Sequence, residues 1–189
     1  MSFVLRTARL ELAPATLEIV IADLHCRERL SELLRAELGE GWPPPLYDVR
    51  AMEWMKRSLQ VDPALGAWTA WYWIQRRPRI LIGLSGFKSR PVNGAVEISY
   101  SALAAYQRRG FATEAIAAMV NWAFANGAEC VVAETLPELS PSQRTLMKNG
   151  FRYTGEGSEP GVMRYERWRV EDHRQTQGAK REKRRPGKI

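Results

Sequence analysis

Six consecutive residues, Gln107-Arg108-Arg109-Gly110-Phe111-Ala112, have the composition and position of an anion-binding turn. They lie between a segment of strand-like alternation and the clearest helical pattern of the chain, so their NH groups are expected to point outward at a helix N-terminus. Unpaired NH groups and the helix dipole favour a pyrophosphate, and Gly110 and Ala112 leave room for its approach. Arg108 and Arg109 would add positive charge there, or would only be solvated side chains of an ordinary glycine-containing turn.

The residues before this turn predict the elements that must hold it. Alternating apolar residues over 5–13 predict a strand. Apolar residues at helical spacing over 17–38 and 49–59 predict two helices, and the glycines and prolines between them force a loop. The period then changes to alternation over three segments rich in β-branched and aromatic residues, which predict an antiparallel meander: 67–74, 79–87 and 95–103.

The residues after the turn predict two further helices and three strands. The helix over 112–124 has apolar residues at the i, i+3, i+4, i+7 spacing and is followed by Asn126-Gly127, a stop signal. Ser140-Pro141-Ser142-Gln143 has the form of a capping box with proline at the first helical position, and predicts a helix that ends at Asn149-Gly150. The expected strands are 130–136, 151–154 and 162–168, the last two flanking a glycine-rich loop over 155–161.

The turn and its surroundings resemble the GCN5-related N-acetyltransferase (GNAT) superfamily. The pattern Gln/Arg-x-x-Gly-x-Gly/Ala is the signature with which that family holds coenzyme A, and residues 107–112 match it. The resemblance covers most of residues 3–169, in the family's order of elements. Four segments are similar to the branch that includes the ribosomal-protein-alanine acetyltransferases: Thr7-Ala8-Arg9-Leu10-Glu11-Leu12, Gly94 to Tyr100, Gly110 to Ala115, and Ser142 to Phe151.

The resemblance implies an α/β (α+β) fold, with one GNAT domain over 1–172. Its central sheet would be mixed but mostly antiparallel, with about seven strands and about four flanking helices. The fourth and fifth strands would splay apart and leave a V-shaped cleft, in which the pantetheine arm of acetyl-CoA pairs with a free strand edge. The expected cofactor-binding residues are Tyr100, Ser101, Ala102, Leu103, Gln107, Arg108, Arg109, Gly110, Phe111, Ala112 and Thr113.

The same resemblance implies an acetyl-CoA-dependent N-acetyltransferase in which an amine attacks the thioester directly within a ternary complex. An alkylammonium has a pKa near ~10.4, so a base should remove its proton. Glu97 is the first candidate and Glu134 the second, although a strand carboxylate can also simply be ion-paired or solvated. Where many relatives have asparagine, this chain has Leu139. Ser142 is then the nearest hydroxyl for the leaving thiolate, or else a helix-cap residue.

The acceptor is expected to be a primary amine, either a small molecule or a protein N-terminus. The loop over 39–47 and the loop over 155–161 should close its site. Trp42, Tyr47 and Trp54 are candidates for an aromatic wall, with Gly157 on the other side, although large aromatic residues more often belong to a core.

Composition sets the remaining expectations. The longest apolar stretches are far shorter than the roughly 20 residues of a membrane-spanning helix, and the start of the chain lacks a signal-peptide pattern. Two cysteines and two histidines give no readable metal site or disulfide framework, so a reducing cytoplasm is expected. Most of the net charge of +7 lies in residues 173–189, which we interpret as a basic, disordered tail.

Two other functions remain open from the sequence. A non-catalytic, regulatory acyl-CoA-binding module would keep the phosphate turn without the proton-handling residues, and Leu139 is its best support. Contact with nucleic acid or the ribosome would depend on the tail, which has no aromatic residues interleaved with its charges, so we do not expect it. The oligomeric state is undetermined, and a homodimer is compatible with the sequence.

Overall fold

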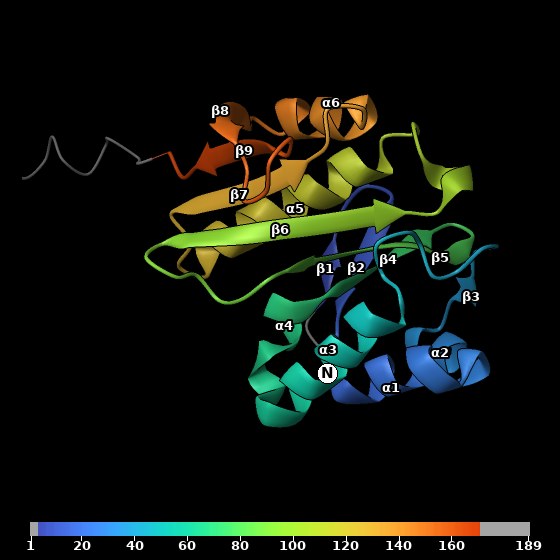
Figure 1. The fold of residues 1–189 in the computed structure, drawn as a ribbon. Coiled ribbons are helices and arrows are strands. Elements are labelled where there is room, and N and C mark those ends of the chain that lie inside the picture. The colour runs from blue at the N-terminus through green and yellow to red at the C-terminus, as the bar shows by residue number, and fades with distance from the viewer. Residues whose placement is uncertain (1–3, 171–189) are drawn as a thin grey trace, which may run out of the picture.

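A nine-stranded mixed sheet runs through the residues that the computed structural model describes, 4–170 (Figure 1). The strand order is β1-β2-β4-β5-β6-β7-β9-β8, and the short β3 pairs in parallel with β5. All neighbours along that order are antiparallel except β6 and β7. The strands are β1 (Leu5–Arg6), β2 (Leu10–Pro14), β3 (Glu37–Leu38), β4 (Trp71–Arg76), β5 (Arg79–Phe87), β6 (Ala95–Ala102), β7 (Cys130–Thr135), β8 (Arg152–Glu156) and β9 (Met163–Trp168).

Helices cover both faces of this sheet, and each face has its own apolar core. In Figure 1, α1, α2 and α3 lie together below the sheet, while α5 and α6 lie on its other side. In one core, α1, α2 and α3 pack against β4 and β5. In the other, α5 and α6 pack against the opposite face of the sheet. The helices are α1 (Leu17–His25), α2 (Arg27–Leu34), α3 (Val49–Val61), α4 (Gly66–Thr69), α5 (Phe111–Ala125) and α6 (Ser140–Lys148).

The expected fold class is confirmed. Residues 4–170 contain nine strands and six α-helices, where about seven and about four were expected. The difference comes mainly from short elements, since β1 and β3 have two residues each and α4 has four. None of the helices among residues 4–170 is long and apolar enough to cross a membrane. The basic segment 173–189 lies outside the described residues.

Three expected elements are divided or shortened. The strand predicted over 5–13 is divided into β1 and β2, which pair with each other antiparallel. The helix predicted over 17–38 is interrupted at Cys26, whose extended backbone (φ −152°, ψ 94°) ends α1 and begins α2, and residues 37–38 form β3 instead. The strand predicted from residue 67 begins only at Trp71, because Gly66–Thr69 form α4. The Thr69 hydroxyl donates to the carbonyl of Leu65, which stabilises this extra helical turn.

The capping box predicted at Ser140 is wrong. Leu139 occupies the N-cap position of α6 and makes no side-chain capping bond, while Ser140 is already helical. Gln143 instead donates from its side-chain amide to the carbonyls of Leu136 and Pro137. These two bonds connect α6 to the segment between β7 and α6. The glutamine therefore stabilises that segment and does not cap the helix.

β6 and β7 splay apart, as expected, and this gap positions the candidate site. These strands pair over only three residues each, Ala95 to Glu97 with Cys130 to Val132. Beyond Glu97, β6 continues to Ala102 with β5 paired along its other edge. The edge that faces β7 is therefore free of strand pairing over the second half of β6.

Candidate active site

The glycine turn leads from the end of β6 into α5. Gly110 is the N-cap of α5 and has φ +81°, a left-handed conformation that glycine adopts without a steric penalty. Arg108, two residues earlier, also has a positive φ of 57°. Both arginines and the glycine are exposed. The turn therefore lies on the surface at the start of a 15-residue helix.

The backbone NH groups of this turn are available for an anion. Within residues 4–170, the amides of 108 to 113 donate to no protein acceptor, and the first amide of the helix to do so is that of Glu114, which donates to the Gly110 carbonyl. Unpaired NH groups at a helix N-terminus, together with the helix dipole, are suited to phosphate. The turn thus has the geometry expected for residues 107–112.

The other expected cofactor residues surround the turn in different ways. Gln107 donates its side-chain amide to the carbonyl of Ala102, 3.0 Å away, and so holds the turn against the end of β6. Ser101, Ala102 and Leu103 are buried, which leaves mainly backbone atoms for contact. Phe111 is buried in the core beneath the turn, while Ala112 and Thr113 are half-buried in the first turn of α5.

Arg9 and Glu114 hold the glycine turn in place through hydrogen bonds, and neither residue was expected from the sequence to contact it. Arg9 Nε donates to the Glu114 carboxylate (2.7 Å), and Arg9 Nη1 donates to the carbonyl of Arg109 (2.9 Å). Thr7, which also precedes β2, donates its hydroxyl to the same carboxylate. No local pattern could have revealed these contacts, because they join residues about 100 positions apart in the sequence.

Tyr100 and Ser142 are brought together across the splay. Their hydroxyl oxygens lie 2.9 Å apart, and the Tyr100 hydroxyl is also 3.3 Å from the carbonyl oxygen of Ser142. Ser142 is in the first turn of α6, so the pair joins β6 to that helix. Burial raises the pKa of Tyr100 to about 12, which keeps this phenol protonated at neutral pH.

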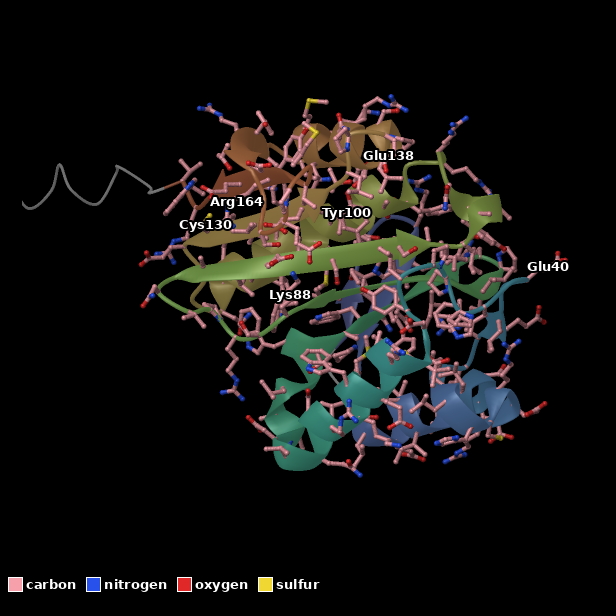
Figure 2. The ribbon with its side chains drawn as sticks, viewed as in Figure 1. Glu40, Lys88, Tyr100, Cys130, Glu138 and Arg164 are labelled. Carbon is pink, nitrogen blue, oxygen red and sulfur yellow. The ribbon has the colours of Figure 1, made fainter. Side chains whose placement is uncertain are left out.

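Glu97 and Glu134 each have a cationic partner. Lys88 Nζ lies 2.5 Å from Glu97 Oε1, and its exposed side chain reaches over from the end of β5. Glu134 accepts hydrogen bonds from the amide and hydroxyl of Ser158, and Arg164 lies 3.8 Å away. Lys88 directly follows β5 and Arg164 is on β9, so the two cations come from opposite sides of the β6–β7 pair (Figure 2). Both carboxylates are therefore ion-paired while remaining partly accessible.

The candidate acid and base residues lie on opposite faces of the sheet. Val96 and Ile98 of β6 face the α5 core, so Tyr100 points the same way and Glu97 points to the other face. Along β7, Val131 and Ala133 face that core, so Glu134 shares the face of Glu97. The gap between the strands is the place where groups from both faces can approach one molecule.

The three aromatic residues expected around the acceptor have different environments. Trp42 and Tyr47 are only 3% and 4% exposed, whereas Trp54 is 43% exposed on α3. Trp42 stacks on Tyr72 of β4 and donates to the Asp23 carboxylate, so its ring belongs to the core. The Tyr47 hydroxyl lies 3.3 Å from both the carbonyl and the hydroxyl oxygen of Ser99.

These positions change the expected acceptor wall. Tyr47 approaches β6 through its hydroxyl only, and an exposed wall made of all three rings is not present. Gly157, in contrast, lies beside Glu134: a Cβ there would be 3.1 Å from the Glu134 carboxylate. Among residues 4–170 no group of three or more His, Cys, Asp or Glu side chains could hold a metal ion.

Comparison with known proteins agrees with this geometry. A family model described as an acetyltransferase (GNAT) domain matches residues 3–152. A curated relative, the uncharacterized N-acetyltransferase YjdG of Bacillus subtilis (strain 168), is 25% identical over 169 residues, which cover 87% of this chain and 95% of that protein.

Solved structures share the fold at low sequence identity. The ribosomal-protein-S5-alanine acetyltransferase of Vibrio fischeri has a TM-score of 0.64 at 17% identity, over 89% of this chain and 98% of that one. RimL, a ribosomal L7/L12 α-N-protein acetyltransferase in complex with coenzyme A, has a TM-score of 0.62 at 20% identity, over 88% and 98%. With the family model matched across most of its length, the chain belongs to the GNAT family of acetyltransferases.

Proposed function

We propose that the chain is an acetyl-CoA-dependent N-acetyltransferase that transfers the acetyl group to a primary amine by direct attack. The observation that carries this proposal is the exposed turn at Gly110, which lies next to the edge of β6 that has no strand partner. Among the described residues, its amides 108 to 113 have no protein acceptor. A diphosphate fits such a turn, and an extended pantetheine arm fits such an edge. RimL, which shares the fold, was solved with coenzyme A.

In this proposal, the two substrates approach from opposite faces of the sheet. The thioester would enter from the α5 and α6 side, where the turn and the Tyr100–Ser142 pair lie. The amine would approach from the side of Glu97 and Glu134. Its ammonium form must lose a proton before attack, and Glu97 is our candidate for the base, directly or through water. Glu134, held by Ser158 and Arg164, is the second candidate.

The leaving thiolate needs a hydrogen-bond donor. The Tyr100 hydroxyl is protonated at neutral pH, because burial raises its pKa to about 12, and Ser142 holds it at the edge of the gap. A phenol with so high a pKa holds its proton more tightly than an ordinary thiol does, so it would stabilise the thiolate by donating a hydrogen bond rather than by losing its proton. This pair supplies the donor that Leu139 cannot.

A protein N-terminus or a small-molecule amine would serve as the acceptor. The ribosomal-protein acetyltransferases among the structures that share the fold support the first of these. Thiol release from acetyl-CoA should be measured with peptides, small amines and aminoglycosides as acceptors. We expect turnover with at least one of these classes. Tight binding of coenzyme A with no thiol release from any acceptor would instead favour the regulatory acyl-CoA-binding module.

A further inference from the structure

Arg9 lies in the connection between β1 and β2 and makes contacts on both sides of the glycine turn. Its Nε donates to Glu114 and its Nη1 donates to the carbonyl of Arg109, at 2.7 and 2.9 Å. Its guanidinium carbon also lies 4.5 Å from the centre of the Phe111 ring, stacked over that ring. Three contacts therefore fix the guanidinium in one orientation, although half of the side chain is exposed.

The third nitrogen of this guanidinium, Nη2, takes no part in these hydrogen bonds. Within residues 4–170, Nη2 of Arg9 donates to no protein atom, and it lies 3.2 Å from the position that a Cβ on Gly110 would occupy. This NH₂ group thus lies against a turn whose amides 108 to 113 also lack a protein acceptor within residues 4–170. Guanidinium groups bind phosphate oxygens strongly because charge and geometry both match.

The negative charge of Glu114 lies beside the proposed phosphate site and is neutralised by Arg9. It lies in the first turn of α5, four residues after Gly110, where a carboxylate would repel a bound diphosphate. Burial alone would raise the pKa of Glu114, but hydrogen bonds from Thr7 and Arg9 outweigh that effect and lower it, so the group is ionised. The ion pair with Arg9 compensates this negative charge beside the anion site.

We propose that Arg9 is a phosphate-binding residue of the cofactor site, with Nη2 donating to a diphosphate oxygen while its other two nitrogens hold the turn in place. This inference depends on the proposed function, because it requires that the turn binds the diphosphate of coenzyme A. It adds to the site a residue about 100 positions upstream of the turn, and it gives a function to the β1–β2 connection.

The test is the dissociation constant for coenzyme A, measured by calorimetry at two salt concentrations. Arg9→Gln is expected to weaken binding about ten- to hundredfold, the usual effect of losing a hydrogen bond between charged groups, and to make binding less sensitive to salt. Arg9→Lys keeps the charge but not the planar fork and should lose less. Arg6→Gln is the matched control, since Arg6 is also in this region but is exposed and pairs with Glu11.

Glu114→Gln separates a phosphate contact from a merely structural role. It removes the ion pair but leaves the positive charge of Arg9, so coenzyme A should bind as tightly as to the wild type, or more tightly. Equal weakening in Glu114→Gln and Arg9→Gln, or no weakening in Arg9→Gln, would overturn the proposal. If the wild type itself does not bind coenzyme A, the proposed function fails instead. Thermal unfolding of each ligand-free variant identifies any that misfold, in which case Arg9→Lys decides the test.

Discussion

The hydroxyl groups of Tyr100 and Ser142 lie 2.9 Å apart and join β6 to the first turn of α6, on the face of the sheet opposite to Glu97. If this pair stabilises the leaving thiolate, Tyr100→Phe should lower kcat roughly tenfold, because one hydrogen bond to developing charge is lost. Ser142→Ala should lower it less, since it only loosens the phenol. Affinity for coenzyme A should change little. Tyr153→Phe, on the exposed side of β8, is the control, and a kcat unchanged in Tyr100→Phe would exclude this role.

The buried phenol should also affect stability at high pH. Its pKa is about 12 in the folded protein, against an ordinary value of 10.0, so the folded state holds this proton more tightly than the unfolded state. The corresponding stabilisation is complete below pH 10 and is lost as pH rises from 10 to 12. Tyr100→Phe should therefore have a flatter dependence of its free energy of unfolding on pH in that window, as measured by urea denaturation. Identical slopes would contradict this.

Glu97→Gln should lower kcat by about two orders of magnitude or more, the usual contribution of a general base. The dissociation constant for coenzyme A should stay within about twofold, because Glu97 lies on the face where we propose that the amine approaches, and the turn lies on the other. Glu37→Gln, an exposed carboxylate on β3, is the control. If Glu97→Gln keeps full activity while Glu134→Gln loses it, the base is Glu134.

Gly110→Ala should weaken binding of coenzyme A. At φ +81° an alanine costs about 1–2 kcal/mol, and its methyl group would press on Arg9 Nη2 at 3.2 Å, so the turn would shift. Gly127→Ala is the matched control, because Gly127 has φ +99° with open space around it and lies just beyond the other end of α5. Both variants should lose stability, but only Gly110→Ala should lose affinity. Equal affinities would show that the turn does not contact the ligand.

Asp23→Asn should stabilise the protein at neutral pH. Burial raises the pKa of Asp23 despite the hydrogen bond from Trp42, so the folded state favours the protonated form. The stability that this group contributes is present at low pH and is lost as pH rises through its folded pKa. Asparagine has no charge and still accepts from Trp42, so its advantage should be largest at pH 7 and shrink toward pH 4. Asp48→Asn is the control and should have little effect on stability, because Asp48 is the N-cap of α3 and asparagine caps a helix about as well as aspartate does.

The elements that were predicted well have long, uninterrupted periodicity. The strand over 79–87 has the bounds expected of it, and the helix over 112–124 is longer by one residue at each end. The errors fall where a single residue decides. The extended backbone of Cys26 divides a helical pattern into two helices. Residues Gly66–Thr69 form a short helix, although the apolar alternation that begins at residue 67 is typical of a strand.

The site was predictable only as far as it is local in sequence. The turn at Gly110 was recognisable because six adjacent residues define it, and the faces of Glu97 and Tyr100 follow from strand alternation. Contacts between distant segments were not. Tyr100 and Ser142 are 42 positions apart, and Arg9 and Glu114 are 105 apart, with no pattern to relate them. The burial of Trp42 also depends on distant partners, Asp23 and Tyr72.

The three residue pairs that join β6 to β7 also limit how cooperatively the sheet unfolds. Strands β7, β8 and β9 are connected to the rest of the sheet by this short ladder and by the helices packed behind it. We therefore expect these strands to open as a separate unit, with its own rate of amide hydrogen exchange. A ligand arm that pairs with the free edge would link the two halves, and exchange in β7 to β9 should then slow to the rate of global unfolding.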